Sequence, residues 1–454
     1  MYNIRLNHVS DAYDFNELIK IFLPPAAYRL AFEAEKAEGK IVEINEGASC
    51  DKNEIKRELY RRLADLTGKK PPWGILTGVR PVKLAGELAA QAGSSGALEI
   101  LKRDYLLQEE KARLLVDIYE YQQQLLGAAE PASLGVYVGI PFCPTRCLYC
   151  SFTSNQQGAE EIEKYLEALL DEIEYCGRAA AQKGMRTESV YIGGGTPTTL
   201  SAAQLDRLLT KLEDSFDLDL CREFTVEAGR PDTITAEKLA LISSHGIRRI
   251  SINPQTMKDQ TLALIGRRHS AAETRAAFAL ARERGDFLVN ADVIAGLPGE
   301  NEEDFAASLA EIIALDPCNI TVHTLAVKKA SRLIEADEDY HYKQAAVVEK
   351  MLAKSKELLA AAGYRPYYLY RQKHMAGALE NVGYCRDDEA CIYNIRIMDE
   401  HQSILAMGAG GISKKYYPQE NRLERVPNVS NYQVYIERLA EMLARKESRF
   451  FEEV

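Results

Sequence analysis

The sequence predicts an α/β fold: a partial (β/α)6 barrel with an N-terminal α+β module and a C-terminal α+β region. Between residues 134 and 326, six short apolar runs alternate with longer helical stretches. This alternation is typical of a parallel sheet covered by helices. The segments on either side lack it. Six units rather than eight predict an incomplete barrel, and ligands of such folds bind at the carboxyl ends of the strands.

Residues 1–130 are expected to form an accessory domain. Leu18–Leu23 and Lys40–Ile44 are expected to be short strands around the Pro24-Pro25 break. Helical spacing of apolar residues predicts three helices, over Asn53–Leu66, Val82–Ala92 and Leu98–Leu126.

The loop 71–81 lies between two of these helices and contains the only tryptophan, Trp73. Its Pro and Gly content favours a packed loop anchored by Trp73 over a ligand site. Residues 127–133 are expected to be a linker.

The barrel, residues 134–326, is predicted from alternating strands and helices. The expected strands are Gly135–Ile140, Ser189–Ile192, Glu223–Val226, Arg248–Ile252, Leu288–Ile294 and Ile320–Thr324. The expected helices are Glu160–Gln182, Ala202–Ser215, Ala236–His245, Ala271–Arg284 and Glu302–Leu315.

Residues 327–454 are expected to form a region that covers substrate and cofactor. A predicted helix, Tyr342–Ala362, precedes a segment dense in tyrosine and cations, 364–374. Tyrosine faces can stack on flat rings of a ligand, and cations can pair with carboxylates. A half-buried strand explains most of these tyrosines equally well, but Arg371 or Lys373 is expected to face a pocket. The pair Lys328-Lys329 either meets substrate carboxylates or begins a helix.

Composition excludes some classes of function. The formal net charge of the 454-residue chain is −11, which argues against general nucleic-acid binding because that requires Lys and Arg against phosphates. No run reaches the length of a membrane span, and no secretory signal begins the sequence. Nine cysteines without a regular framework fit a reducing compartment. We therefore expect a cytoplasmic protein.

Three cysteines, Cys143, Cys147 and Cys150, follow the first barrel strand at the spacing C-x3-C-x2-C. The chain between them is too short, and their number is odd, for a disulfide framework. Thiolates are the preferred ligands of iron–sulfur clusters and zinc. The loop therefore predicts a [4Fe–4S] cluster with one iron open, a zinc site with a fourth ligand from elsewhere, or buried cysteines.

Further polar or glycine-rich motifs follow the other strands. Gly193-Gly194-Gly195 lacks every Cβ, so its backbone can approach a ligand closely. Glu227 ends the third strand, and Asp292 lies on the fifth. Singly, such motifs are typical of turns, helix caps or surface ion pairs.

Together, these motifs carry a resemblance to a known family. The stretch Tyr-x-Gly-Ile-Pro-Phe-Cys-x3-Cys-x-Tyr-Cys-x-Phe, residues 137–152, is similar to the signature of radical S-adenosylmethionine (SAM) enzymes. More narrowly it resembles the oxygen-independent coproporphyrinogen III oxidase (coproporphyrinogen dehydrogenase) family. Residues 71–81 resemble its HemZ-type branch.

The resemblance implies a [4Fe–4S] cluster on Cys143, Cys147 and Cys150, whose open iron binds SAM. The cluster would cleave SAM to a 5′-deoxyadenosyl radical that takes a hydrogen atom from a substrate propionate, and loss of CO2 and an electron would leave a vinyl group. Two such reactions give protoporphyrinogen IX. The implied SAM contacts are Tyr137, Tyr149, Gly194, Gly195, Thr196, Glu227, Gln255, Arg267, Asp292, Ala326 and Ile412. The resemblance also implies a tetrapyrrole substrate and an electron donor of flavodoxin or ferredoxin type.

Two departures keep other functions open. The proven oxidases carry a further cysteine where this chain has Phe152. Phenylalanine occurs there in the heme-chaperone branch, but the terminal His-Asn-x-x-Tyr-Trp motif of that branch is missing, since Trp73 is the only tryptophan. The alternatives are a heme-binding chaperone and a radical SAM enzyme acting on another tetrapyrrole, such as heme.

Overall fold

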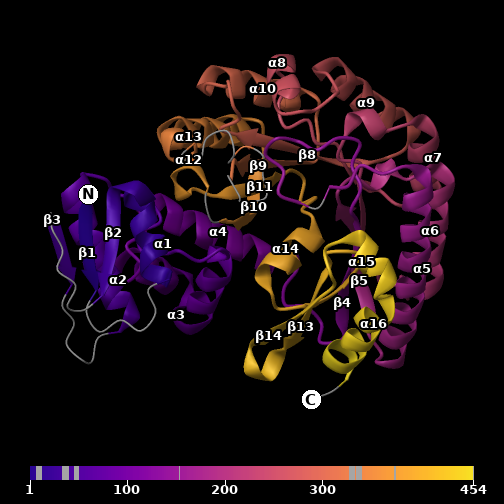
Figure 1. The fold of residues 1–454 in the computed structure, drawn as a ribbon, viewed down its shortest axis with the longest axis horizontal. Helices are drawn as coiled ribbons and strands as arrows, with labels where there is room; N and C mark the ends of the chain where they lie inside the picture. The colour runs from indigo at the N-terminus through magenta and orange to yellow at the C-terminus, as the bar shows by residue number, and fades with distance from the viewer. Residues whose placement is uncertain are drawn as a thin grey trace.

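The computed structural model describes residues 1–6, 13–32, 40–44, 51–152, 154–326, 333, 340–372 and 375–452. The pair Lys328-Lys329 and Lys373 lie outside these residues. The described chain builds one small sheet near the N-terminus and one large sheet that carries the rest of the fold (Figure 1).

The small sheet is a three-stranded parallel sheet in the order β2-β1-β3. Its strands are β1 (Tyr2–Leu6), β2 (Tyr28–Phe32) and β3 (Lys40–Ile44), so the strand expected at Lys40–Ile44 is confirmed. Helices α1 (Tyr13–Phe22) and α2 (Lys52–Thr67) pack together against it.

The strand expected at Leu18–Leu23 is wrong, because this segment belongs to helix α1. Phe15, Leu18, Ile19 and Phe22 are all buried. Their spacing of three and four residues places them on one face of a helix. A six-residue window showed only an apolar run, and the longer period became visible only when Phe15 was included.

The helix expected over Leu98–Leu126 breaks after Arg103. Its first part belongs to α3 (Pro81–Arg103), which also covers the expected helix Val82–Ala92, and its second part is α4 (Glu109–Leu125). Between them Leu106 has a positive φ of 57°. The loop containing Trp73 pairs with this break, since the Ile75 amide donates to the Tyr105 carbonyl at 2.9 Å and the Gln108 amide to the Pro72 carbonyl at 3.0 Å. The expected packed loop at Trp73 is confirmed, because this side chain is 1% exposed.

The large sheet has eleven strands in the order β10-β11-β9-β8-β7-β6-β5-β4-β12-β13-β14. Strands β4 to β9 pair in parallel and match the six expected strands. Their bounds are β4 (Ser133–Ile140), β5 (Arg186–Gly194), β6 (Glu223–Glu227), β7 (Arg249–Ser251), β8 (Leu288–Ala295) and β9 (Asn319–Thr324).

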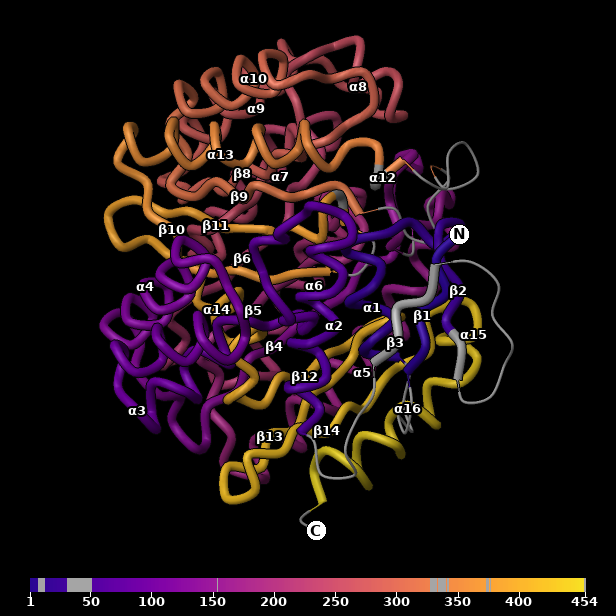
Figure 2. The backbone as a smooth tube through the Cα atoms, turned by 90° about the vertical axis from the view of Figure 1, so that its left-hand side faces the viewer, coloured from indigo at the N-terminus to yellow at the C-terminus, as the bar shows by residue number. Residues whose placement is uncertain are grey.

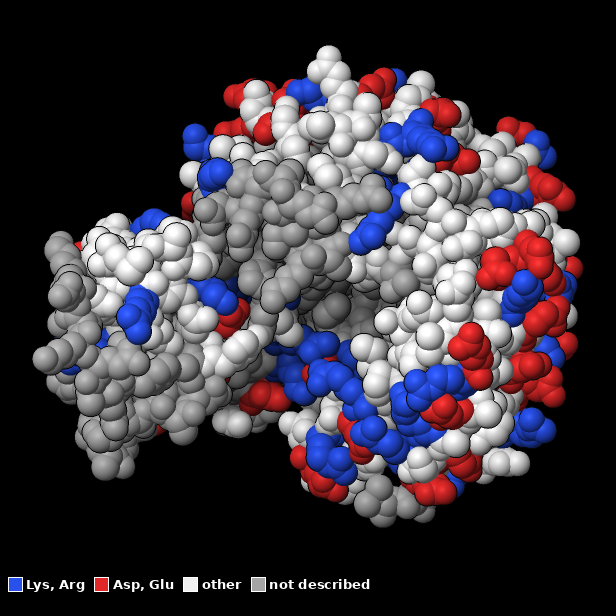
Figure 3. All heavy atoms as spheres, viewed as in Figure 1, with Lys and Arg blue, Asp and Glu red and all other residues white. Residues whose placement is uncertain are grey.

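Helices cover the outer face of these parallel strands (Figure 1). All five expected helices are present, and the sequence did not indicate the short α8. The helices are α5 (Ala159–Gln182), α6 (Ala202–Ser215), α7 (Ala236–Ser244), α8 (Asp259–Leu264), α9 (Ala271–Arg284) and α10 (Glu302–Ala314). Capping boxes fix the starts of α6, α9 and α10. Acidic and basic side chains alternate over the helix-covered side (Figure 3).

The C-terminal region extends the same sheet at both ends. Strand β11 (Asn381–Cys385) pairs antiparallel with β9, and β12 (Ser403–Met407) pairs parallel with β4. Figure 2 shows the strands following one another from β8 and β9 at the top to β13 and β14 at the bottom. The division at residues 130 and 326 stays a prediction, because one sheet runs through the second boundary.

The remaining elements of this region include helix α13, which confirms the expected helix from Tyr342 to Ala362, and strand β10 in the tyrosine-rich segment. The elements are α12 (Tyr340–Lys343), α13 (Ala345–Ala361), β10 (Arg365–Tyr370), α14 (Ile392–Asp399), β13 (Ile412–Tyr417), β14 (Arg422–Pro427), α15 (Tyr432–Glu437) and α16 (Leu439–Lys446).

Candidate functional site

The cysteine loop follows β4 and is tied to its neighbours by backbone hydrogen bonds. The Cys143 amide donates to the Asn155 carbonyl at 2.9 Å, and the Leu148 amide donates to the Ile265 carbonyl at 2.9 Å. The Thr145 hydroxyl donates to the Gly266 carbonyl at 2.9 Å. The loop is therefore held from both sides by the protein itself.

All three loop cysteines line one cavity of about 380 Å³ at the carboxyl ends of the parallel strands. This volume lies in the range of small-molecule sites. Ten of the eleven expected SAM contacts line the same cavity. These residues are Tyr137, Tyr149, Gly194, Gly195, Thr196, Glu227, Gln255, Arg267, Asp292 and Ala326.

Ile412 is the one expected contact that does not line the cavity. It begins β13 and is 47% exposed. The turn before it contains Gly408 and Gly410, both with positive φ, and it leads the chain into β13, which lies between β12 and the edge strand β14. Sequence similarity of the glycine-rich segment did not reveal this change of direction.

The glycine motif leaves room beside the first cysteine. A Cβ on Gly195 would lie 3.0 Å from the Cys143 sulfur and 2.5 Å from the Phe142 carbonyl oxygen. A Cβ on Gly193 would lie 3.1 Å from the Glu227 carboxyl carbon. At Gly195 a Cβ would meet backbone oxygen, so only glycine fits there and the chain after β5 closely borders the cysteine loop, while Gly193 lies close to the Glu227 carboxyl group.

The three thiols are free and partly or fully buried. Burial raises the pKa of Cys143 to about 11 and also raises the pKa of Cys150. The Cys143 sulfur lies 3.4 Å from the Thr196 hydroxyl. Because metals bind the thiolate, loading of this loop must release protons.

In the described part of the chain, no three His, Cys, Asp or Glu side chains surround a single point as ligands of one metal ion would. In a [4Fe–4S] cluster each protein thiolate binds a different iron. Three cysteines that line one cavity therefore need not meet at one point to hold such a cluster.

Two carboxylates face the cavity from β6 and β8. Burial raises the pKa of Glu227 to about 7, against the effect of a 2.5 Å hydrogen bond from the Tyr191 hydroxyl. Burial also acts to raise the pKa of Asp292, but His323, 3.5 Å away, and a hydrogen bond from Asn290 outweigh it and lower that pKa. Such carboxylates can accept hydrogen bonds from hydroxyl or ammonium groups.

Asn253 and Gln255 follow β7, and Arg267 follows α8. The Arg267 guanidinium donates to the Asn253 carbonyl at 2.7 Å and to the Tyr149 hydroxyl at 3.2 Å. Gln255 has a φ of 69°, which is unusual for a residue with a side chain. Backbone strain of this kind collects at functional sites.

The polar atoms of these residues fit a bound polar cofactor. The Asn253 and Gln255 side-chain oxygens and the Arg267 Nε are buried without a hydrogen-bond partner within the described residues. Buried polar groups are normally paired, so unpaired ones grouped at one cavity indicate a missing ligand. The chemistry of the set, with thiols, carboxylates and a guanidinium, matches a cluster together with an amino-acid-containing molecule.

Several cavity residues were not identified from the sequence. Tyr191 lines the cavity and stacks on the neighbouring ring of Tyr393 with ring centroids 4.6 Å apart. His323 and Tyr370 also line it, and His323 contacts the Tyr370 hydroxyl at 3.1 Å. The alternating pattern of β5 could have indicated Tyr191. Asn394 and Met398 could not be found in this way, because they line the cavity from α14, far along the chain.

Arg371, expected to face a pocket, lines a second cavity of about 150 Å³ rather than the one beside the cysteines. Its guanidinium lies 4.9 Å from the centre of the Trp73 ring and donates to the Ala378 carbonyl. These contacts bind the N-terminal region to the C-terminal strands.

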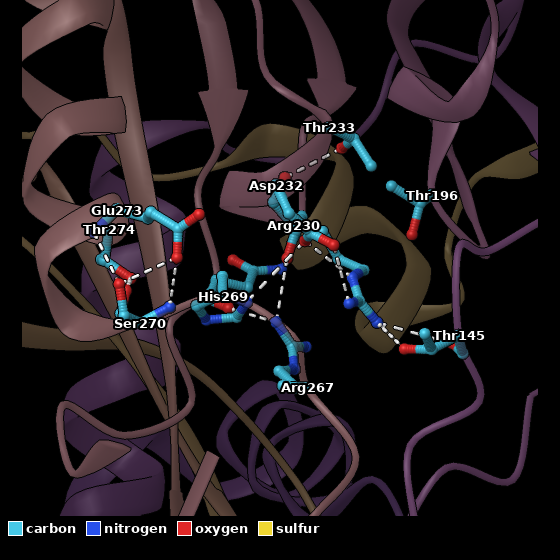
Figure 4. Close-up of polar contacts among 12 residues, drawn as sticks. Thr145, Thr196, Arg230, Asp232, Thr233, Arg267, His269, Ser270, Glu273 and Thr274 are labelled. Carbon is cyan, nitrogen blue, oxygen red and sulfur yellow. Dashed lines mark hydrogen bonds and ion pairs between the residues drawn. The ribbon is translucent and has the colours of Figure 1, made fainter. Parts of the chain in front are cut away.

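Arg230 also was not identified from the sequence. It follows β6, is 3% exposed, and lies between Asp232 and Thr145 (Figure 4). Together with Arg267 it borders the cavity close to the cysteine loop.

Comparison with known proteins shows which family this chain is similar to. Residues 137–312 match the family described as the Radical SAM superfamily. The chain is 40% identical over 397 residues to the oxygen-independent coproporphyrinogen-III oxidase-like protein HemZ of Bacillus subtilis, covering 85% of this chain and 78% of that protein. It is 36% identical over 196 residues to the heme chaperone HemW of the same organism, covering 42% of this chain and 50% of HemW.

The fold is similar to the solved structure of coproporphyrinogen III oxidase (HemN) from Escherichia coli. The TM-score is 0.55 at 22% identity, over 72% of this chain and 73% of that structure. This similarity confirms the predicted α/β class with a central sheet and covering helices. Among the described residues, no helix is both long and apolar enough to cross a membrane.

Proposed function

The chain belongs to the family of oxygen-independent coproporphyrinogen III oxidase-like proteins of the radical SAM superfamily, and from this we propose that it decarboxylates coproporphyrinogen III without oxygen. It is a radical SAM oxidoreductase of that family. The proposed reaction converts two propionate side chains to vinyl groups and gives protoporphyrinogen IX. Each propionate loses one hydrogen atom, one CO2 and one electron.

The observation that carries this proposal is the single cavity shared by the cysteine loop and the polar strand ends. Cys143, Cys147 and Cys150 would hold a [4Fe–4S] cluster, which leaves one iron for SAM. When bound, the cluster and SAM supply the radical chemistry that removes the hydrogen atom. An electron-carrier protein would reduce the cluster, and a second acceptor would take the electron released by the substrate.

The protein's own residues would bind and orient SAM. The fork-shaped guanidinium of Arg267 suits a carboxylate. The close backbone of Gly194 and Gly195 can receive the amino group, and Glu227 and Asp292 can accept hydrogen bonds from ammonium and ribose hydroxyls. Tyr137, Tyr149, Thr196, Gln255 and Ala326 complete the proposed contacts. No side chain has to act as a strong acid or base, because hydrogen-atom abstraction involves no proton transfer.

Phe152 is proposed to meet the substrate. It lines the cavity next to the cysteine loop and is 65% exposed. An exposed aromatic ring at the mouth of a cavity can stack on a flat tetrapyrrole. Tyr370 and Gln372 line the cavity from the C-terminal strands.

An anaerobic turnover experiment tests the reaction. The protein is loaded with iron and sulfide and given SAM, a strong reductant and coproporphyrinogen III. We expect 5′-deoxyadenosine together with a stepwise loss of two formic-acid equivalents from the porphyrin mass. 5′-Deoxyadenosine with an unchanged porphyrin would retain the radical enzyme but reject this substrate.

Binding of SAM tests the site directly. We expect Arg267→Lys to weaken SAM binding about tenfold or more, because a lysine cannot replace two parallel hydrogen bonds to a carboxylate. Arg268→Lys is the matched control, since the adjacent Arg268 is exposed. Anaerobic isothermal titration calorimetry of the loaded protein measures both. Equal dissociation constants in the two variants would remove Arg267 from the proposed site.

A heme chaperone is the second candidate, favoured by the similarity to HemW and by Phe152 at the position of the oxidases' further cysteine. This function predicts tight stoichiometric heme binding without SAM cleavage. Absence of 5′-deoxyadenosine from a loaded protein, together with saturable heme binding in a spectroscopic titration, would favour it. A mass change in heme itself would instead indicate a radical SAM enzyme acting on another tetrapyrrole.

A further inference from the structure

The Arg230 side chain is buried at the cavity wall and contacts Thr145 of the cysteine loop (Figure 4). Its Nη1 donates to the Thr145 hydroxyl at 2.7 Å and approaches the Thr145 carbonyl at 3.5 Å. The same nitrogen lies 3.9 Å from the Cys147 sulfur. One nitrogen of the guanidinium therefore faces the loop at the central cysteine.

The opposite edge of the guanidinium binds a carboxylate. Nε and Nη2 donate to the two Asp232 oxygens at 3.0 Å and 2.9 Å. The His269 Nδ1 lies 3.8 Å from Asp232, and the His269 side chain is fully buried. Arg230 is thus fixed from behind by a bidentate ion pair, which leaves it little freedom to turn away from the loop.

The loop is held by this contact on one side and by Gly266 on the other. The Thr145 hydroxyl accepts from Arg230 and donates to the Gly266 carbonyl at 2.9 Å. Arg267, the next residue, contacts Tyr149 on the cavity side. The two arginines therefore contact different parts of the site. Arg267 is one of the proposed SAM contacts, and Arg230 contacts the loop beside the Cys147 sulfur.

We propose that Arg230 is a positioning residue that fixes Thr145 to Cys147 and sets a positive charge beside the Cys147 sulfur, which raises the reduction potential of the cluster bound there. This inference rests on the proposed cluster site. Arg230 is not among the expected SAM contacts.

The direction of the effect follows from charge. Reduction adds one negative charge to the cluster, and a nearby cation stabilises the reduced form more than the oxidised form. Net charge and hydrogen bonds to sulfur are known determinants of cluster potentials. Asp232 opposes the cation from its far edge, so removal of the Asp232 charge must act in the opposite direction to removal of the Arg230 charge.

The test compares Arg230→Gln and Asp232→Asn with the native full-length protein, all loaded anaerobically with iron and sulfide. Arg248→Gln is the control, because it removes a positive charge that is 62% exposed and pairs with Asp286 at the surface. Circular dichroism establishes folding, iron and sulfide analysis measures cluster retention, and redox titration followed by electron paramagnetic resonance measures the potential.

We expect Arg230→Gln to retain less cluster and to shift the potential negative. At a fixed solution potential the ratio of reduced to oxidised cluster should fall about tenfold, which is about 59 mV for a one-electron couple. Asp232→Asn should shift the potential in the positive direction. A merely structural contact would not give shifts of opposite sign.

The outcomes separate this inference from the proposed function. Native protein that retains no cluster contradicts the proposed site and this inference with it. Native protein that loads, with a folded Arg230→Gln variant equal to Arg248→Gln in retention and potential, overturns the role of Arg230 alone. If Arg230→Gln does not fold, Asp232→Asn decides, and an unchanged potential in that variant also overturns the inference.

Discussion

At the scale of single residues, the candidate site brings together polar groups that are unfavourable to bury without a charged or hydrogen-bonding partner. Burial raises the pKa of Glu227 to about 7, so its carboxyl group stays largely protonated below that pH. Asn253 and Gln255 keep side-chain oxygens buried without partners in the described structure. Each of these features costs stability in the free protein. A bound polar ligand would remove the cost, which is the physical reason for assigning these residues to a site.

Glu227→Gln is expected to change how stability depends on pH. The folded-state pKa of Glu227 is raised, so the folded protein binds more protons than the unfolded chain between pH 4.5 and about 7. The stability of the native protein therefore falls as pH rises through this window, by at most about 3 kcal/mol from this group. The variant lacks that decrease and should be more stable than the native protein at pH 8 but not at pH 4.5.

The measurement is urea unfolding of the cluster-free protein at pH 4.5 and pH 8. Glu160→Gln is the control, since this carboxylate is 84% exposed and should give the same difference from native at both values. If Glu227→Gln behaves as this control does, the pKa of Glu227 is not raised by folding.

At the scale of elements, the loop at Trp73 connects the N-terminal region to the sheet. The indole nitrogen of Trp73 donates to a Glu380 oxygen at 2.8 Å, and Lys111 from α4 pairs with the other Glu380 oxygen at 2.5 Å. Glu380 precedes β11, whose first residue, Asn381, accepts from the Thr324 amide at 2.8 Å and lines the main cavity. The loop therefore supports the cavity wall through one buried carboxylate.

Trp73→Phe should destabilise the protein by about 1–3 kcal/mol, because it leaves a buried Glu380 oxygen without its donor. Thermal unfolding followed by calorimetry measures the loss. A double-mutant cycle with Glu380→Gln provides the control, since two residues in direct contact should give non-additive changes. Strictly additive losses would mean that the two side chains do not act together.

At the scale of the whole molecule, the turn after β12 and the C-terminal helices pack against α5, the first helix of the barrel. Glu172 on α5 accepts hydrogen bonds from the Gly408 amide at 2.7 Å and the Tyr435 hydroxyl at 2.6 Å. Lys446 on α16 pairs with it at 2.7 Å, and both side chains are fully buried. One buried carboxylate thus joins α5, the turn after β12 and the two C-terminal helices.

Lys446→Met is expected to destabilise the whole protein by about 3–5 kcal/mol, because it leaves the buried Glu172 charge without its counter-ion. Lys211→Met is the matched control: Lys211 is 31% exposed and pairs with Glu174 on the same helix, and such a pair contributes at most about 1 kcal/mol. Denaturant unfolding of both variants measures the two losses of stability. Similar small losses would show that Glu172 is neutralised or rehydrated without Lys446.

The elements of the barrel were predictable because local periodicity determines them. Alternation and apolar runs gave β4 to β9, and helical spacing gave α6 and α9 with their observed bounds. The N-terminal error at Leu18–Leu23 arose where a short run hides a helical period. The break at Leu106 depends on pairing with the loop at Trp73, which is distant in sequence, so no local signal marked it.

The sequence by itself determined the barrel class, the cysteine loop and the strand-end motifs, because these depend on short-range spacing and on a sheet that brings strand ends to one edge. Only the tertiary structure decided which side chains share the cavity. Asn394 and Met398 line it from α14 and Arg230 approaches the Cys147 sulfur, whereas Ile412 leaves along β13. These placements depend on contacts between segments far apart in the chain, and such contacts leave no periodic pattern in the sequence.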